Sequence, residues 1–113
     1  DNKVRFLESI RTSTDTKKIV ERGVYLCSEM ALDIADLLIV SKDFPKPNTY
    51  RDAIHKLGEY KIVPVEFAYK FIYIAGLRNY LAHEYMTDTA PTLIDFLERK
   101  LEDIKRYLTF VER

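Results

Sequence analysis

The chain has 113 residues, of which 47% are hydrophobic, so it is long enough for one compact domain with a core and too short for two. Its 18 basic and 18 acidic residues give a formal net charge of zero, which argues against a protein that binds nucleic acid over a broad positive face. We therefore expect a single domain over residues 1–113, with any contact to nucleic acid confined to a small local site.

The single cysteine and the lack of long apolar runs indicate the cellular environment. Cys27 has no second cysteine with which to form a disulfide within the chain. The longest apolar stretch, residues 31–40, is interrupted by Asp33 and Asp36, and the first ten residues contain no signal-peptide core. These features predict a cytoplasmic protein that does not associate with a membrane.

The first forty residues predict a short helix and then a long one. Residues 4–10 are amphipathic, and within the polar stretch 12–16 Asp15 or Thr16 is expected to cap a helix that runs to about Val40. Its apolar residues recur at helical spacing, as a main stripe of Ile19, Gly23, Cys27, Met30, Ile34 and Leu38 flanked by Val20, Val24, Ala31 and Ala35. Because this face is broader than one surface helix needs, we expect one side to stay uncovered in the monomer and to form a homodimer interface.

A loop and a short helix are predicted next. Residues 41–48 contain two prolines, which are typical of a loop between helices. Asn48 is expected to cap a short helix that ends near Leu57, with Gly58 in the usual glycine position just beyond a helix C-terminus.

Two more helices complete the chain. Pro64 suits the first turn of a helix that should reach residues 83–86, and Pro91 opens the last helix after a break at residues 87–90. Leucine-type residues follow heptad-like spacing in that last helix, at Leu93, Leu97, Leu101, Ile104, Leu108 and Val111. No segment alternates with the period of a strand, so the predicted fold is all-α, an antiparallel bundle of four to five helices.

Most cofactor and metal motifs are missing from the sequence. The three glycines are dispersed, which excludes a glycine-rich phosphate loop, and one cysteine excludes the common zinc-finger patterns. A di-iron bundle needs paired Glu-x-x-His motifs, and only Asp52-Ala-Ile-His55 approaches this pattern, once and with the shorter acid. We predict no cofactor and no metal site.

Polar residues with chemical potential gather in one segment, residues 78–85, directly after the most apolar helix. Arg78 and Tyr85 are seven residues apart, so a continuous helix places them on one face. His83 is five residues from Arg78 and is turned away from it by roughly 140°. The two side chains converge if the helix loosens near His83, or more easily if a second copy packs its own segment opposite. The structural alternative is that Arg78 and His83 are solvated residues near a helix end.

This segment resembles the R-x-x-x-x-H-x-Y motif of HepT-like proteins, a branch of the HEPN superfamily. The resemblance extends over roughly residues 4–112. It includes the ALDIADLLIV part of the long helix, the proline-bearing loop, Tyr50-Arg51-Asp52 at the start of the short helix, the GEYKIVP approach to the next one, and the final leucine-rich helix.

The resemblance implies a toxin of a HEPN/MNT toxin–antitoxin system. Such a protein is a homodimeric endoribonuclease that cleaves RNA without a metal, at a cleft where both motifs meet, and it leaves a 2′,3′-cyclic phosphate. Arg78 and His83 take the catalytic positions, and Asn79 and Tyr85 line the cleft. A minimal nucleotidyltransferase antitoxin is expected to silence the toxin by attaching AMP to Tyr85.

Two other interpretations stay open at this point. The chain could be a non-catalytic helical partner that positions substrate for a minimal nucleotidyltransferase. It could also be a plain helical dimerisation domain. A neighbouring nucleotidyltransferase gene would argue against the second, and only an activity test separates the first from the toxin.

Overall fold

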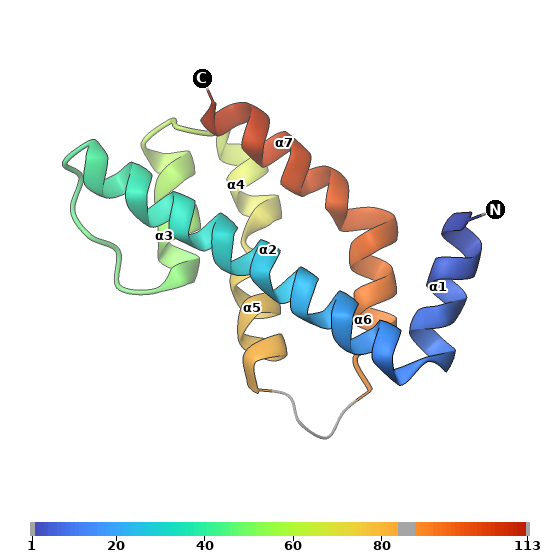
Figure 1. Cartoon of the computed structure of the whole chain (residues 1–113). Helices are drawn as coiled ribbons and strands as arrows, with labels where there is room; N and C mark the ends of the chain where they lie inside the picture. The colour runs from blue at the N-terminus through green and yellow to red at the C-terminus, as the bar shows by residue number, and fades with distance from the viewer. Residues whose placement is uncertain (1, 84–87, 113) are drawn as a thin grey trace.

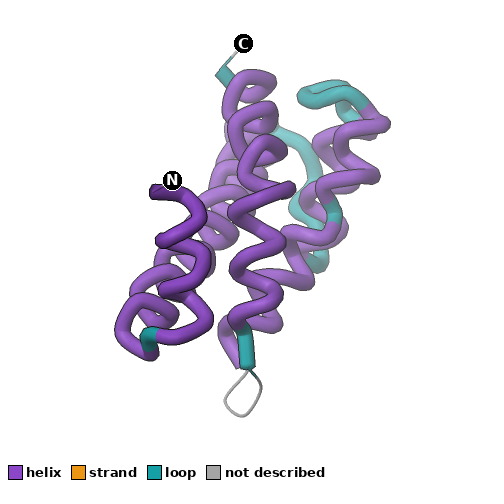
Figure 2. Tube along the Cα trace, turned by 90° about the vertical axis from the view of Figure 1, so that its right-hand side faces the viewer, coloured by secondary structure: helices purple, strands orange, loops and turns teal. Residues whose placement is uncertain are grey.

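The protein is a bundle of helices in the computed structural model, which describes residues 2–83 and 88–112 (Figure 1). The elements are α1 (Asn2–Thr12), α2 (Thr14–Ser41), α3 (Tyr50–Glu59), α4 (Val65–Phe71), α5 (Tyr73–His83), α6 (Ala90–Asp95), the π-helical segment η1 (Phe96–Lys100) and α7 (Leu101–Val111). The described residues contain no strand. The long α2 contacts α1, α3, α5 and α6, and Figure 2 shows the helices packed alongside one another. The all-α prediction is confirmed.

The buried face of α2 differs from the predicted one. The core residues are those expected only to flank the main stripe, together with three others: Val20, Val24, Ser28, Ala31, Leu32, Ala35 and Ile39. In contrast, Ile19 and Met30 of the predicted stripe are 73% and 59% exposed. Both stripes have helical spacing and apolar side chains, so periodicity alone could not choose between them. The small side chains of Ala31 and Ala35 favour the observed face, because they allow neighbouring helices to approach closely.

Both predicted N-caps are wrong by one or more residues. Ser13 caps α2 in place of Asp15 or Thr16, since the Ser13 side chain accepts a hydrogen bond from the Thr16 backbone N–H at 3.2 Å. Thr49 caps α3 in place of Asn48, by accepting a hydrogen bond from the Asp52 N–H at 3.0 Å. In both helices the cap lies three residues before the N–H that it satisfies, which is the usual geometry.

Gly58 lies inside α3 instead of beyond its end. It is buried, and a Cβ atom at this position would lie 2.6 Å from the Cβ of Ala68 and 3.2 Å from the Cα of Val65. The glycine therefore allows α3 and α4 to pack closely. The left-handed backbone conformation expected after a helix occurs later, at Lys61, which has a φ of 61°.

The two C-terminal helices predicted as continuous are both interrupted. Ile72 separates α4 from α5, and its carbonyl accepts a tightened hydrogen bond from the Ala75 N–H at 3.2 Å. The π-helical segment η1 rotates the face that follows it, so Leu108 of the heptad stripe is exposed and Tyr107 is fully buried.

Two tyrosine hydroxyls, of the buried Tyr107 and the half-buried Tyr73, fix α7 in place. The Tyr107 hydroxyl donates to the Ala31 carbonyl of α2 at 2.8 Å. The Tyr73 hydroxyl donates to Oδ2 of the buried Asp103 at 2.9 Å, and Lys70 pairs with Oδ1 of the same carboxylate at 3.5 Å. The α5 helix, which carries the candidate motif, is therefore held between α2 and α7.

Candidate functional site around Arg78

Arg78 lies in the middle of α5 and faces α2. Its Nε donates a hydrogen bond to Oε1 of Glu29 at 3.0 Å, and its Nη2 forms an ion pair with the same oxygen at 2.9 Å. Its Nη1 donates to Oδ1 of Asn79 at 3.2 Å. The side chain of Arg78 is 21% exposed and that of Glu29 is 32% exposed. The guanidinium is therefore held in one orientation while one side remains open to a ligand.

Two tyrosine rings flank the same guanidinium. The Arg78 Cζ atom lies 5.8 Å from the ring centre of Tyr25 on α2 and 5.4 Å from that of Tyr50 on α3. Cation–π contacts of this kind favour the charged arginine. Three helices thus meet at the Arg78 head group.

The ion pair shifts the pKa of both partners. Hydrogen bonds from Arg78 and then Tyr25 lower the pKa of Glu29 below its ordinary value. The hydrogen bond to Glu29 raises the pKa of Arg78. Both groups are therefore charged at neutral pH, and Arg78 is a fixed cation.

His83 lies away from Arg78 within one chain. It is the last residue of α5, and its side chain is exposed. The helix stays α-helical up to His83, so the loosening that would let the two side chains converge does not occur. Among the described residues no hydrogen bond or ion pair joins Arg78 to His83. The sequence-based angle of roughly 140° between them therefore applies.

The other predicted site residues have different outcomes. Asn79 is exposed and is bonded to Arg78, so the structure places it beside the motif arginine. Tyr85 lies outside the described residues. His55 packs edge-on against Tyr69 at 5.9 Å and lies 3.9 Å from Glu59, so its neighbours are residues of α3 and α4.

The contacts of Tyr25, Glu29 and Tyr50 with Arg78 were not predicted from the sequence. Tyr25 and Glu29 follow Arg22 at steps of three and four residues, so the three form a polar row along one side of α2. That row was a signal available in the sequence. Tyr50 was noted only as part of the start of the short helix. It lies 28 residues before Arg78 in the sequence, so helical spacing could not predict the contact between them.

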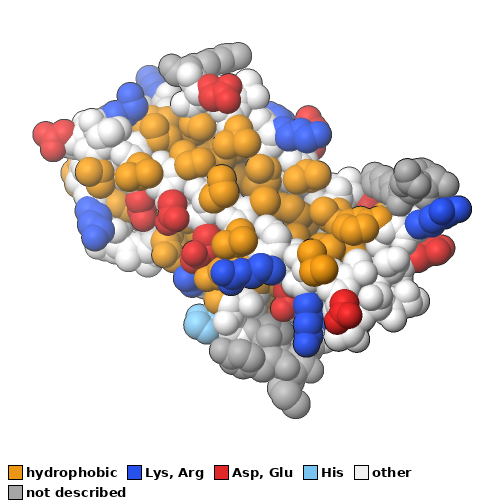
Figure 3. Space-filling model, in the orientation of Figure 1, with side chains coloured by type: hydrophobic (Ala, Val, Ile, Leu, Met, Phe, Trp, Pro, Cys, Tyr) orange, Lys and Arg blue, Asp and Glu red, His pale blue; other side chains and the backbone are white. Residues whose placement is uncertain are grey.

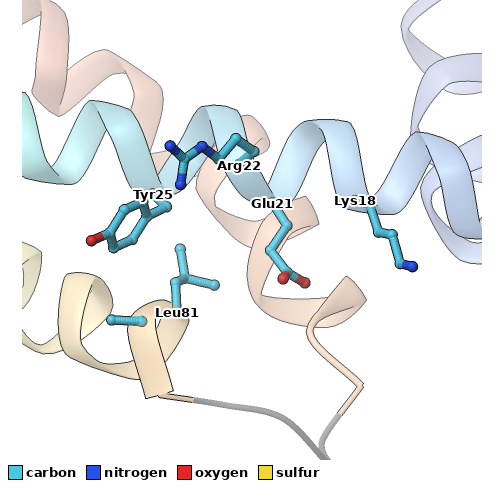
Figure 4. Close-up of a pocket in the computed structure, with 6 residues that line it drawn as sticks. Lys18, Glu21, Arg22, Tyr25 and Leu81 are labelled. Carbon is cyan, nitrogen blue, oxygen red and sulfur yellow. The ribbon is translucent and has the colours of Figure 1, made fainter.

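A hollow of about 370 Å³ lies between α2 and the last turn of α5 (Figure 4). It is lined by Lys18, Glu21, Arg22 and Tyr25 of α2 and by Leu81 and Ala82 of α5. A second hollow, of about 590 Å³, lies on the Tyr50 side and includes Asn79 in its lining. Each hollow is thus lined by a contact residue of Arg78, Tyr25 in the first and Tyr50 and Asn79 in the second.

The part of the chain that the structure describes has neither a metal-binding cluster nor a membrane-spanning helix. No three His, Cys, Asp or Glu side chains there form a group that could bind a metal ion. None of the helices described there has the length and hydropathy needed to cross a bilayer.

Comparisons with known proteins give consistent results. The family model described as "Ribonuclease HepT-like" matches residues 3–111. A protein named "tRNA nuclease HepT" from Aphanizomenon flos-aquae (strain 2012/KM1/D3) is 34% identical over 79 residues, which are 70% of this chain and 54% of that protein. This chain thus spans about half the length of that relative. A crystal structure described as "toxin-antitoxin with AMP-PNP" has a TM-score of 0.83 at 16% identity, covering 98% of this chain and 95% of the other. Identity this low shows the fold alone.

Proposed function

The chain belongs to the HepT-like ribonuclease family, and we propose that it is an endoribonuclease toxin whose site forms where two copies bring Arg78 and His83 together. The observation that carries this proposal is the fixed, partly open Arg78 on α5, five residues before an exposed His83, in a chain that the family model matches almost throughout. The name of the curated relative suggests transfer RNA as the substrate.

The chemistry of the two residues suits RNA cleavage without a metal. The ribose 2′-hydroxyl oxygen attacks the adjacent phosphorus, the bond from phosphorus to the 5′-oxygen breaks, and a 2′,3′-cyclic phosphate and a 5′-hydroxyl result. His83 takes the proton from the 2′-hydroxyl and then delivers it to the departing 5′-oxygen. Arg78 donates hydrogen bonds to the phosphate oxygens and neutralises the charge that develops there.

Support for a two-chain site comes from the uncovered face of α2. Its exposed apolar side chains, Ile19, Leu26, Met30, Leu37 and Val40, are between 43% and 73% exposed. Together with Gly23 and Asp33 they recur at alternating steps of four and three, the spacing with which one helix packs against another. We name these seven residues the α2 seam. In Figure 3 hydrophobic side chains gather across the face on which α2 lies.

The position of the seam relates it to Arg78. Its middle, near Met30, is adjacent in sequence to Glu29, the residue that holds Arg78. Two copies related by a two-fold axis at this level would have both Arg78 side chains close to the axis. An RNA phosphate bound there could contact Arg78 of one copy and His83 of the other.

Regulation is proposed to act at Tyr85, two residues after His83. In the antitoxin reaction the tyrosine hydroxyl attacks the α-phosphorus of ATP and pyrophosphate leaves, so that AMP becomes attached. The added phosphate would bring bulk and negative charge to the place where the RNA phosphate binds. Tyr85→Phe should retain cleavage but gain no AMP mass when incubated with a cognate nucleotidyltransferase, ATP and magnesium. An undiminished adduct on Tyr85→Phe would exclude Tyr85 from this role.

The activity itself is tested on purified protein with labelled transfer RNA. Arg78→Ala and His83→Ala should each abolish cleavage, by at least about 100-fold, while leaving the circular dichroism spectrum unchanged. Cleavage by the wild type should persist in EDTA. Loss of activity on chelation, with recovery on adding a divalent ion, would contradict the mechanism.

One observation favours the non-catalytic alternative, a helical partner of a nucleotidyltransferase. Glu29 already pairs with Arg78, as in a purely structural ion pair. A wild type that cleaves no RNA but stimulates a nucleotidyltransferase would establish this second function.

A further inference from the structure

The hollow between α2 and the end of α5 has two cations, Lys18 and Arg22, along one edge. Lys18, Arg22, Tyr25 and Glu29 follow one another at steps of four, three and four residues, so they lie along the side of α2 that faces α5. Lys18 and Arg22 are both exposed, and one helical turn of about 5.4 Å separates them along the axis. The opposite edge of the hollow, Leu81 and Ala82, lies between Arg78 and His83 in the sequence.

Both cations of this row have exposed side chains. Among the described residues neither Lys18 nor Arg22 pairs with a carboxylate. The one carboxylate that lines the hollow, Glu21, accepts a hydrogen bond from the Thr89 hydroxyl at 2.6 Å. Figure 4 shows the Glu21 side chain directed away from the Arg22 guanidinium.

Tyr25 connects the row to the motif arginine. The Arg22 Cζ atom lies 5.7 Å from the Tyr25 ring centre, and the Arg78 Cζ atom lies 5.8 Å from the same ring. Positive charge therefore continues from Arg78 past an aromatic ring to Arg22 and then to Lys18. Sites for single-stranded RNA combine a positive groove that follows the backbone with aromatic side chains that stack on bases.

We propose that Lys18 and Arg22 bind the sugar–phosphate backbone of the RNA next to the scissile phosphate, with Tyr25 as the stacking surface between them and Arg78. This inference rests on the proposed function and adds the path of the substrate strand. It also accounts for how a chain with no net charge can hold RNA, because two cations outside the motif are concentrated at the one place where a polyanion must enter.

The test compares two double variants that remove the same charge. Lys18→Ala/Arg22→Ala should raise the KM for transfer RNA about tenfold and change kcat by less than about twofold, because the reacting groups are intact. The slope of log KM against log salt should fall by about 1.4, since each lost phosphate contact on a single strand removes about 0.7. The control, Arg99→Ala/Lys105→Ala, removes two exposed cations outside the hollow and should behave as wild type.

Two further measurements keep this inference separate from the proposed function. Light scattering and circular dichroism verify that both double variants keep the fold and the oligomeric state of the wild type. Fluorescence anisotropy with labelled transfer RNA, in the His83→Ala background, measures binding even if the chain proves to be no nuclease. A KM, an affinity and a salt slope equal to those of the control variant would overturn the proposal, whatever the result of the cleavage assay.

Discussion

The guanidinium of Arg78 has Glu29, Asn79, Tyr25 and Tyr50 as neighbours in the free chain. Its Nε and Nη2 share one carboxylate oxygen of Glu29, which fixes the plane of the group, and its Nη1 donates to the exposed Asn79. We interpret Glu29 as a positioning residue for Arg78, because a fixed donor loses less side-chain entropy when it binds a phosphate.

Glu29→Ala should lower kcat for RNA cleavage by about tenfold to a hundredfold, since the guanidinium would no longer be held in place. Glu29→Gln retains an oxygen acceptor for Arg78 and should recover most of the loss. Single-turnover cleavage rates measure this, and melting temperatures show whether the fold is affected. Equal loss in Glu29→Ala and Glu29→Gln would contradict a positioning role that depends on the acceptor oxygen.

At this scale the sequence predicted only part of the arrangement. The motif resemblance identified Arg78, Asn79, His83 and Tyr85, and helical geometry predicted that Arg78 and His83 diverge. Neither the motif nor helical geometry could identify Glu29 as the partner of Arg78, because 49 residues separate them and only the packing of α5 on α2 brings them together.

The close packing of α3 against α4 requires that residue 58 have no Cβ atom. Gly58→Ala should destabilise the fold by about 1–3 kcal/mol, because the added Cβ would lie 2.6 Å from that of Ala68. Gly76→Ala is the matched control. It is also in a helix, but its added Cβ has no neighbour within 4 Å, so it should stabilise the protein by about 0.5–1 kcal/mol. Urea unfolding measures both changes, and equal effects would contradict the packing described for Gly58.

The hydrogen bond between Tyr73 of α5 and Asp103 of α7 predicts how the free energy of unfolding changes as the pH becomes alkaline. Burial, and then the hydrogen bond to Asp103, raise the pKa of Tyr73 above its ordinary value. An unfolded tyrosine ionises near pH 10 while the folded one stays neutral, so this contribution is complete below about pH 10 and is lost as the pH rises. Between about pH 10 and 12, Tyr73→Phe should lose stability less steeply than the wild type, by at most about 1.4 kcal/mol per pH unit.

The control for the alkaline experiment is Tyr69→Phe, since Tyr69 is 65% exposed. The unfolding free energy of Tyr69→Phe should change with pH in the same way as that of the wild type. If the unfolding free energy of Tyr73→Phe also follows that of the wild type above pH 10, the prediction that folding raises the pKa of Tyr73 is wrong.

The existence of most elements was predictable because prolines, glycines and apolar spacing mark them. Their interruptions were not, because the break at Ile72 and the π-helical segment η1 have no proline or glycine to signal them. The choice of the buried face of α2 also escaped prediction. That helix is apolar on two sides, and only the packing of the other helices decides which side is covered.

The uncovered side of α2 leads to a prediction for the whole molecule. Met30→Glu would place a charge in the middle of the α2 seam and should convert a homodimer into a monomer, because burying an unpaired carboxylate is strongly unfavourable. Leu108→Glu adds the same charge at an exposed leucine of α7 outside the seam, and should remain dimeric. Light scattering at micromolar concentration distinguishes the two, and a stable wild-type monomer would exclude this interface.

The central claim, a site shared between two chains, is tested most directly by mixing two inactive variants. Arg78→Ala and His83→Ala are unfolded together, refolded together and assayed on transfer RNA. If each site takes Arg78 from one copy and His83 from the other, a mixed dimer contains one site with both residues intact. With half of the dimers mixed, cleavage should return to about a quarter of the wild-type rate. Mixed dimers that are verified by differential tagging and still cleave no RNA would contradict the account.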